Sequence, residues 1–361
     1  MKKYLIFTAI ALLAFASCSK FAEERTADRA ISFQVANFAQ TKATADYKEG
    51  YKDVSFGAYA WYKGVSASDN TTFMTNQKVS YKAADNTWVP DGTTYYWPKS
   101  GSLDFICYSP YAEGTDKVSI AEDKVSFSGY TVGTYDLMYG DKVTGINDNK
   151  TTYYYNGVPV LFHHALARVA FQVKAAYVEK EADTKDKTKW EVTVNSAKVE
   201  GVYTTGDLSL TLDGKAWKLP ANKVWKADAS KKKDLTFDTK GLKVLTLEPQ
   251  ALGTPAFVLP QLLSGGQKVV LNVTIVTYRD KGDGYVPVLT EKDVELAAPL
   301  SAGKLPQWGI NQDIVYTFVI APSRSQVDPS DPEEKPEPIV ITFDPAVADW
   351  QKVEVNAQIN I

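Results

Sequence analysis

The sequence contains few of the residues that enzymes and metal sites need. Among its 361 residues are only two histidines, His163 and His164, and only two cysteines. Adjacent residues of a strand point to opposite faces, so these histidines cannot bind one metal ion or act as a catalytic pair. The chain also lacks a Gly-x-Ser-x-Gly elbow and a phosphate-binding glycine loop. We therefore expect no enzyme activity, no metal and no cofactor, and an envelope hydrolase is the least supported alternative.

The chain also lacks an excess of charge of either sign. Its 40 Lys and Arg residues nearly balance 43 Asp and Glu residues, and no basic block occurs. A protein that binds nucleic acid would carry a basic stripe or patch. Nucleic acid is therefore not an expected partner.

The N-terminus has the pattern of an export signal. Lys2 and Lys3 precede an apolar run at 4–15 that is too short to span a bilayer, so residues 1–17 are expected to be a signal peptide. Small residues then precede Cys18, as in the lipobox of bacterial lipoproteins. Cys18 is the predicted lipidation site, and the polar residues 18–29 are its tether. Simple secretion with Cys18 discarded is the alternative.

The second cysteine has a different predicted role. If Cys18 carries lipid, Cys107 has no partner for a disulfide. In the alternating segment 103–107, Cys107 shares a face with Leu103 and Phe105. We expect a buried, unreactive thiol.

The residue types that are abundant in the chain favour an all-β protein. Tyrosine, valine and threonine are common, few helical periods occur, and short strand signals alternate with turn residues. This spacing is typical of meander or Greek-key strands. The length suits two domains, which we place at 30–160 and 161–361, each an expected β-sandwich.

The first strand of the mature chain is predicted at the start of the N-terminal domain. Ile31, Phe33 and Val35 alternate with smaller or polar residues and would share one face, and Phe38 follows. Lys42 lies in the polar segment after it. Cutting there would remove the strand and leave a slot in a sheet that a strand of another molecule could fill. An ordinary first strand that stays in place is the alternative.

The last segment, 352–361, has the cleanest period-two pattern in the chain. Its apolar residues fall on one face and its polar residues on the other. The segment is a candidate donor strand through Val353, Val355, Ala357, Ile359 and Ile361.

Two further groups each allow a functional and a structural interpretation. Trp88, Tyr95, Tyr96 and Trp97 could form a sugar-binding platform, although such clusters are more often core. A predicted hairpin at 268–285 carries Asp280 and Asp283 at its charged tip. These aspartates lack the ligand spacing of a calcium loop, so a solvated turn is favoured.

Several weak motifs together resemble the fimbrillin family of Bacteroides-type bacteria, the subunits of lipoprotein-derived fimbriae and related surface adhesins. They comprise the Cys18 lipobox, Ile31-Ser32-Phe33 followed by Thr41-Lys42-Ala43, Phe105 to Pro110, Tyr135 to Tyr139, Leu161 to Val169, Gln307-Trp308-Gly309, Tyr316-Thr317-Phe318 and Val347 to Trp350.

The resemblance implies two tandem β-sandwich domains of transthyretin-like topology. It implies export as a lipoprotein to the outer membrane, removal of the first strand by a trypsin-like protease, and strand donation by the C-terminal end of the next subunit. The implied partners are other fimbrial subunits, identical or paralogous, and a host or bacterial surface receptor.

One departure from the family pattern affects the cleavage site. Members that polymerise usually carry arginine there, whereas this chain has Lys42; Arg25 and Arg29 precede the strand, where cutting would release only the lipid. A stalk, tip or anchor role stays open. The alternative function is a lipid-anchored, monomeric surface module that binds glycan or host protein through aromatics such as Trp61, Trp88, Trp217 and Trp225.

Overall fold

A computed structural model describes residues 30–35, 51–84, 87–114, 117–147, 157–175, 188–244, 247–263, 266–300, 305–321 and 340–349. Within these ranges the chain forms strands β1 to β26 and two short 3₁₀ helices, η1 (Tyr51–Asp53) and η2 (Ala67–Asp69). The expected all-β fold is confirmed. No helical segment in these ranges has the length and apolar character needed to cross a membrane.

The first sheet curls around its own core. Its strands lie in the order β10-β1-β4-β3-β2-β5-β8-β11, with β9 also paired to β5. The end strands β10 and β11 are separated in the chain by Leu161 alone, so the two ends of the sheet lie next to each other. The bounds are β1 (Phe33–Val35), β2 (Phe56–Lys63), β3 (Thr71–Lys82), β4 (Thr87–Pro90), β5 (Ser102–Ser109), β8 (Met138–Gly140), β9 (Val143–Ile146), β10 (Val158–Val160) and β11 (Phe162–His164).

A second sheet covers the outer face of the first. Strand β2 is buried on both faces: Ala58 points into the closed core, whereas Tyr59 and Trp61 point outward, where they pack with Phe127 and Leu210 of the second sheet. The strands of the second sheet are β6 (Val118–Ala121), β7 (Lys124–Thr131), β14 (Thr205–Asp213), β15 (Ala216–Lys218) and β16 (Lys226–Ala227).

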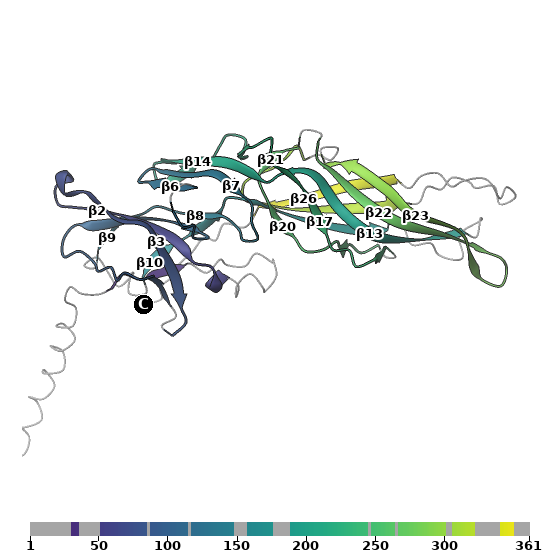
Figure 1. Cartoon of the computed structure of the whole chain (residues 1–361), viewed down its shortest axis with the longest axis horizontal. Coiled ribbons are helices and arrows are strands. Elements are labelled where there is room, and N and C mark those ends of the chain that lie inside the picture. The colour runs from purple at the N-terminus through teal and green to yellow at the C-terminus, as the bar shows by residue number, and fades with distance from the viewer. Residues whose placement is uncertain are drawn as a thin grey trace, which may run out of the picture.

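The third and fourth sheets form a sandwich in the rest of the molecule, at the right of Figure 1. One contains β12 (Ala167–Ala175), β19 (Gln250–Ala251), β20 (Ala256–Val258), β25 (Gln312–Ala321) and β26 (Val340–Asp349). The other contains β13 (Thr188–Tyr203), β17 (Lys232–Phe237), β18 (Leu242–Val244), β22 (Lys268–Asp280) and β23 (Tyr285–Pro299). A small pair, β21 (Gln261–Leu262) and β24 (Gln307–Trp308), completes the described strands.

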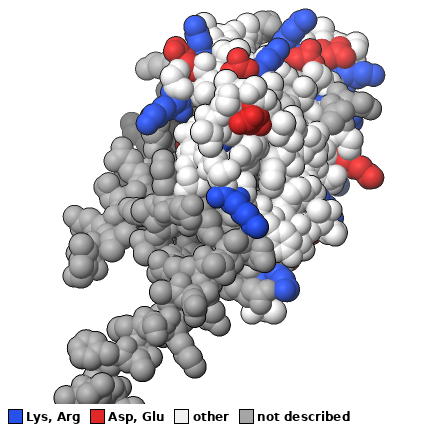
Figure 2. Space-filling model, turned by 90° about the vertical axis from the view of Figure 1, so that its left-hand side faces the viewer, with Lys and Arg blue, Asp and Glu red and all other residues white. Residues whose placement is uncertain are grey.

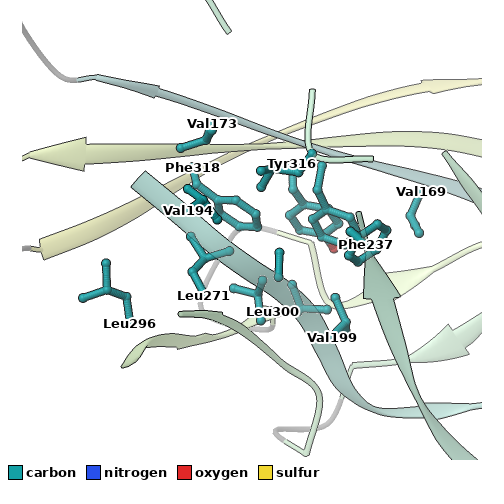
Figure 3. Close-up of a cluster of buried hydrophobic side chains, with 14 of the residues drawn as sticks. Val169, Val173, Val194, Val199, Phe237, Leu271, Leu296, Leu300, Tyr316 and Phe318 are labelled. Carbon is teal, nitrogen blue, oxygen red and sulfur yellow. The ribbon is translucent and has the colours of Figure 1, made fainter. Parts of the chain in front are cut away.

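Aromatic rings fill the centre of this sandwich (Figure 3). Phe171 stacks on Tyr316 with ring centroids 5.2 Å apart and packs against Phe237 at 4.7 Å. The buried Trp308 donates its Nε1 hydrogen to the Tyr316 hydroxyl at 2.9 Å, so the polar end of each ring is paired.

Sheet pairing crosses the expected domain boundary at residue 160/161. Strand β11 pairs with β8 of the first sheet, and β14 pairs with β7 of the N-terminal half. Trp225 donates from Nε1 to the Ala165 carbonyl at 2.8 Å in the core that the first two sheets share. The division into 30–160 and 161–361 stays a prediction, and the sheets themselves are not divided at that point.

Candidate functional site

Strand β1 lies inside the first sheet, between two strands that are distant in sequence. It runs parallel to β10, with Phe33 opposite Val158, and antiparallel to β4, with Phe33 opposite Trp88. The expected strand is present, and Ile31 and Phe33 are buried as predicted, whereas Gln34 is exposed. Without β1, the facing edges of β4 and β10 would both lose their partner. We call this position the β1 slot.

Phe33 is the main anchor of β1. Its ring is fully buried and meets Phe56 and Phe105 edge to face, with centroids 5.6 Å and 5.7 Å away. Phe56 in turn contacts Phe162 at 5.6 Å. Edge-to-face aromatic contacts add to the free energy of apolar burial. The β1 slot therefore contains a deep aromatic pocket at the Phe33 position.

The backbone immediately before β1 is held by two hydrogen bonds to segments on either side of it. The Ile31 amide donates to the Tyr95 carbonyl at 2.7 Å, and the Val158 amide donates to the Ser32 carbonyl at 2.7 Å. Gly157, which precedes β10, has a positive φ of 113°, and a Cβ there would lie 2.7 Å from the Ser32 carbonyl oxygen. Sequence reasoning missed Gly157 and β10; the only local signal is Gly157 before the alternating Val158-Pro159-Val160.

The other predicted exchange residues lie outside the described ranges. These are Cys18, Arg25, Arg29, Phe38, Lys42 and the candidate donor residues Val353, Val355, Ala357, Ile359 and Ile361.

The last described strand ends in the middle of the molecule. Asp349 of β26 pairs with Gln312, and the neighbouring Asn311 amide donates to the Leu166 carbonyl at 3.0 Å. Leu166 follows β11 of the first sheet by two residues. Strand β26 therefore ends beside the first sheet.

The favoured core interpretation of the aromatic group holds for its two tryptophans, and the alternative sugar-binding platform is not assembled. Trp88 and Trp97 are buried in the core of the first sheet and Tyr95 packs against it, whereas Tyr96 is 51% exposed. Trp61 and Trp225 are also buried, and these two were expected as exposed candidates for ligand binding. That expectation is wrong, because Trp61 lies on the face of β2 that packs against the second sheet, and Trp225 stacks on Phe127 in the core that the first two sheets share.

Trp217 is only partly buried, but its polar atom is already engaged. It packs against the core that the first two sheets share, and its Nε1 donates to the Gly140 carbonyl at 2.9 Å.

The two histidines bind separate partners, as their adjacency predicted. His163 Nε2 lies 2.8 Å from Asp141 Oδ1, and His164 Nδ1 contacts Asp136 Oδ2. The second contact joins two of the weak motifs, at 135–139 and 161–169, which pair as β8 and β11. Within the described part of the chain, no three His, Cys, Asp or Glu side chains gather closely enough to hold a metal ion.

Two further structural expectations are confirmed. Cys107 is buried with Leu103 and Phe105 in one cluster, and burial raises the pKa of its thiol above its usual range. The hairpin β22–β23 turns at exposed residues 281–284, where the Gly282 amide donates to Asp280 Oδ1 at 2.8 Å.

A surface cleft of about 490 Å³ lies beside the sandwich. It is bounded by β17, by β20 and by the segment after β7, with Val202 and Leu259 among its buried lining residues. Its polar lining includes Lys233 and Asp234.

The surface at the end of the molecule formed by the first sheet has mixed charge. Figure 2 shows lysine and arginine side chains interspersed with aspartate and glutamate there, around a broad uncharged area. On the described surface visible in that view, charges of one sign do not gather, in agreement with the balanced composition.

Comparison with known proteins identifies similar sequences and folds. A family model described as fimbrillin-like matches residues 39–303. The crystal structure of a fimbrial protein from Bacteroides vulgatus aligns with 90% of this chain and 100% of its own, at 17% identity and a TM-score of 0.53. A candidate cell adhesion protein from Bacteroides uniformis aligns over 89% and 99%, at 15% identity and a TM-score of 0.47. The first likeness supports the fold alone, and no curated protein sequence matches this chain.

Proposed function

Because this chain belongs to the fimbrillin-like family, we propose that it is a structural subunit or adhesin of bacterial surface fimbriae. It is exported as a lipoprotein through Cys18, anchored in the outer membrane and exposed at the cell surface. Cleavage at Lys42 removes β1, and a strand of another fimbrial subunit takes its place. In this role the protein is a structural component and not an enzyme.

The observation that carries the proposal is the position of β1. A three-residue strand near the N-terminus is inserted between β4 and β10 instead of lying at an edge. Burying Ile31 and Phe33 contributes about 1.5–3 kcal/mol each, before the cost of ordering the strand. Once the chain is cut, a longer apolar strand can match the free energy that burial of Ile31 and Phe33 contributes. The edges of β4 and β10 that face the empty slot also offer it backbone hydrogen bonds.

The chain also carries a candidate strand to donate. The alternating residues Val353 to Ile361 follow β26, which ends at Asp349 beside the first sheet. Donation from one subunit to the slot of the next is a head-to-tail contact, which builds an open filament and not a closed ring.

The test uses the source cells, so that identical and paralogous partners are both present. We expect the wild-type protein to appear in SDS-resistant complexes, with an N-terminus at Ala43 in polymerised material. Lys42→Ala should prevent the subunit from accepting a strand, because β1 is not cut away. Deletion of 353–361 should prevent it from donating one. The double variant should run only as a monomer. The matched control is Lys117→Ala, which changes an exposed lysine distant in sequence from the predicted cut.

Two results would contradict assembly by strand exchange. One is a monomer with an acylated Cys18 as the only surface species in wild-type cells. The other is a set of complexes unchanged in the double variant. The first result favours the alternative, a lipid-anchored monomeric module that binds glycan or host protein, whereas the second would mean that the subunits assemble through a different contact. Trp61, Trp88 and Trp225 cannot form the binding surface of such a module, because they are buried.

A further inference from the structure

We propose that the β1 slot selects a donor strand with an aromatic side chain at the Phe33 position. Its preferred occupant is then a strand from a different subunit and not the C-terminal strand of an identical one. This inference rests on the proposed function and specifies the chemistry of the partner. The distinction decides whether the protein forms filaments of itself or joins mixed assemblies.

The pocket at Phe33 is built for a ring. Phe56 and Phe105 meet the Phe33 ring edge to face from two different strands, β2 and β5. Both walls are themselves held by further rings: Phe56 contacts Trp88 at 5.3 Å, and Phe105 contacts Trp97 at 6.1 Å. Walls supported in this way cannot collapse freely, so a smaller side chain would leave a cavity.

The C-terminal strand offers no ring to this pocket. Its apolar face consists of Val353, Val355, Ala357, Ile359 and Ile361. Trp350 precedes this segment, and the alternation in the sequence predicts it on the opposite face, with Lys352 and Glu354.

The occupant cannot avoid the pocket by sliding. The Val158 amide binds the carbonyl of the residue before Phe33, and Gly157 lets the occupant's backbone approach closely. A shift by one residue would turn every apolar side chain to the outside. A shift by two residues places another aliphatic residue of the C-terminal strand in the pocket, so every permitted register leaves it underfilled.

The experiment uses the full mature chain with a site-specific protease sequence inserted between residues 36 and 50. Cutting leaves β1 bound but no longer covalently attached. Fluorescent peptides then compete for the slot, and their dissociation constants are measured. The peptides are 28–38, the same peptide with Phe33→Ala or Gln34→Ala, and 351–361 with and without Ala357→Phe.

We expect Phe33→Ala to weaken binding about a hundredfold or more, because it leaves the pocket empty. Gln34→Ala, at an exposed position, should change binding by about twofold at most. Peptide 351–361 should bind at least about tenfold more weakly than 28–38, and Ala357→Phe should recover much of that difference.

The proposed selection for an aromatic side chain would be overturned if peptides 351–361 and 28–38 bound equally well, or if Phe33→Ala and Gln34→Ala had equal effects. Strand exchange itself would remain possible in both cases. If no peptide enters the slot, not even 28–38, strand exchange fails and the selection fails with it.

Discussion

Gly157 and Phe33 are in direct backbone contact, although their positions in the sequence differ by 124. A Cβ on Gly157 would lie 2.7 Å from the Phe33 carbonyl carbon and 2.8 Å from its nitrogen. The Gly157 φ of 113° lies in a region of backbone conformation that residues with a side chain rarely adopt. This contact sets how closely β1 and β10 can approach.

Gly157→Ala should therefore destabilise the native chain by about 1–3 kcal/mol, through overpacking and backbone strain. Urea unfolding measures this change. Gly133→Ala is the control, because a Cβ there meets nothing within 4 Å, and its effect should stay within about 0.5 kcal/mol. Equal effects at the two glycines would mean that the β1–β10 contact is looser than described.

The ion pair between parallel strands β12 and β25 should contribute measurably to stability. Arg168 Nε donates to Asp313 Oδ1 at 2.9 Å, and the guanidinium makes a second contact with the same carboxylate. Both side chains are less than one-fifth exposed. Asp313→Ala should cost about 1–3 kcal/mol, because a largely buried guanidinium loses its bidentate partner. Arg168→Lys should not preserve the pair, since an ammonium cannot bind in the same bidentate way.

A double-mutant cycle on Arg168 and Asp313 measures this coupling. The comparison pair is Lys243 and Glu191, whose lysine side chain is 56% exposed. We expect a coupling of at most about 1 kcal/mol there. A coupling at Arg168 and Asp313 no larger than that of the exposed pair would contradict the prediction.

Cys107 should be unreactive in the native protein. Burial raises the pKa of its thiol, and the attacking species in alkylation is the thiolate. In a Cys18→Ala chain, where Cys107 is the only thiol, iodoacetamide at pH 8 should label it only after urea is added. Mass spectrometry counts the labelled fraction. Rapid labelling of the folded chain would show that the core of the first sheet opens readily.

The protein should lose stability in alkali. Burial raises the pKa of Tyr316 to about 12 and, with the nearby Asp136 charge adding to the effect, that of Tyr130 to about 12. In the unfolded chain both phenols ionise near pH 10, about two units lower. Their contribution is complete below pH 10 and is lost as the pH rises from there through 12.

Urea unfolding at pH 9, 10 and 11 should show this decline. Tyrosinate absorbance should appear in the same urea range in which the native structure is lost. Tyr316→Phe should reduce the slope of stability against pH, even though it also removes the acceptor for Trp308. An unchanged slope would mean that Tyr316 ionises in the folded state.

The alternation in the sequence was sufficient to predict the faces of individual strands. Ile31 and Phe33 were expected on one buried face, and Cys107 was expected beside Leu103 and Phe105, because the pleat of a strand fixes which residues point the same way. The hairpin around Asp280 could also be predicted, since its turn residues are contiguous with its strands.

Which strands become neighbours depends on contacts between distant parts of the chain. No local pattern indicated that β1 inserts between β4 and β10, that a second sheet covers Trp61, or that Trp225 belongs to the core that the first two sheets share. Pairing between distant segments is determined by the free energy of packing complete sheets against each other. A local pattern of apolar residues does not reveal that packing. The alternation alone was enough to predict an all-β chain with a buried first strand; long-range packing placed that strand between β4 and the end strand β10.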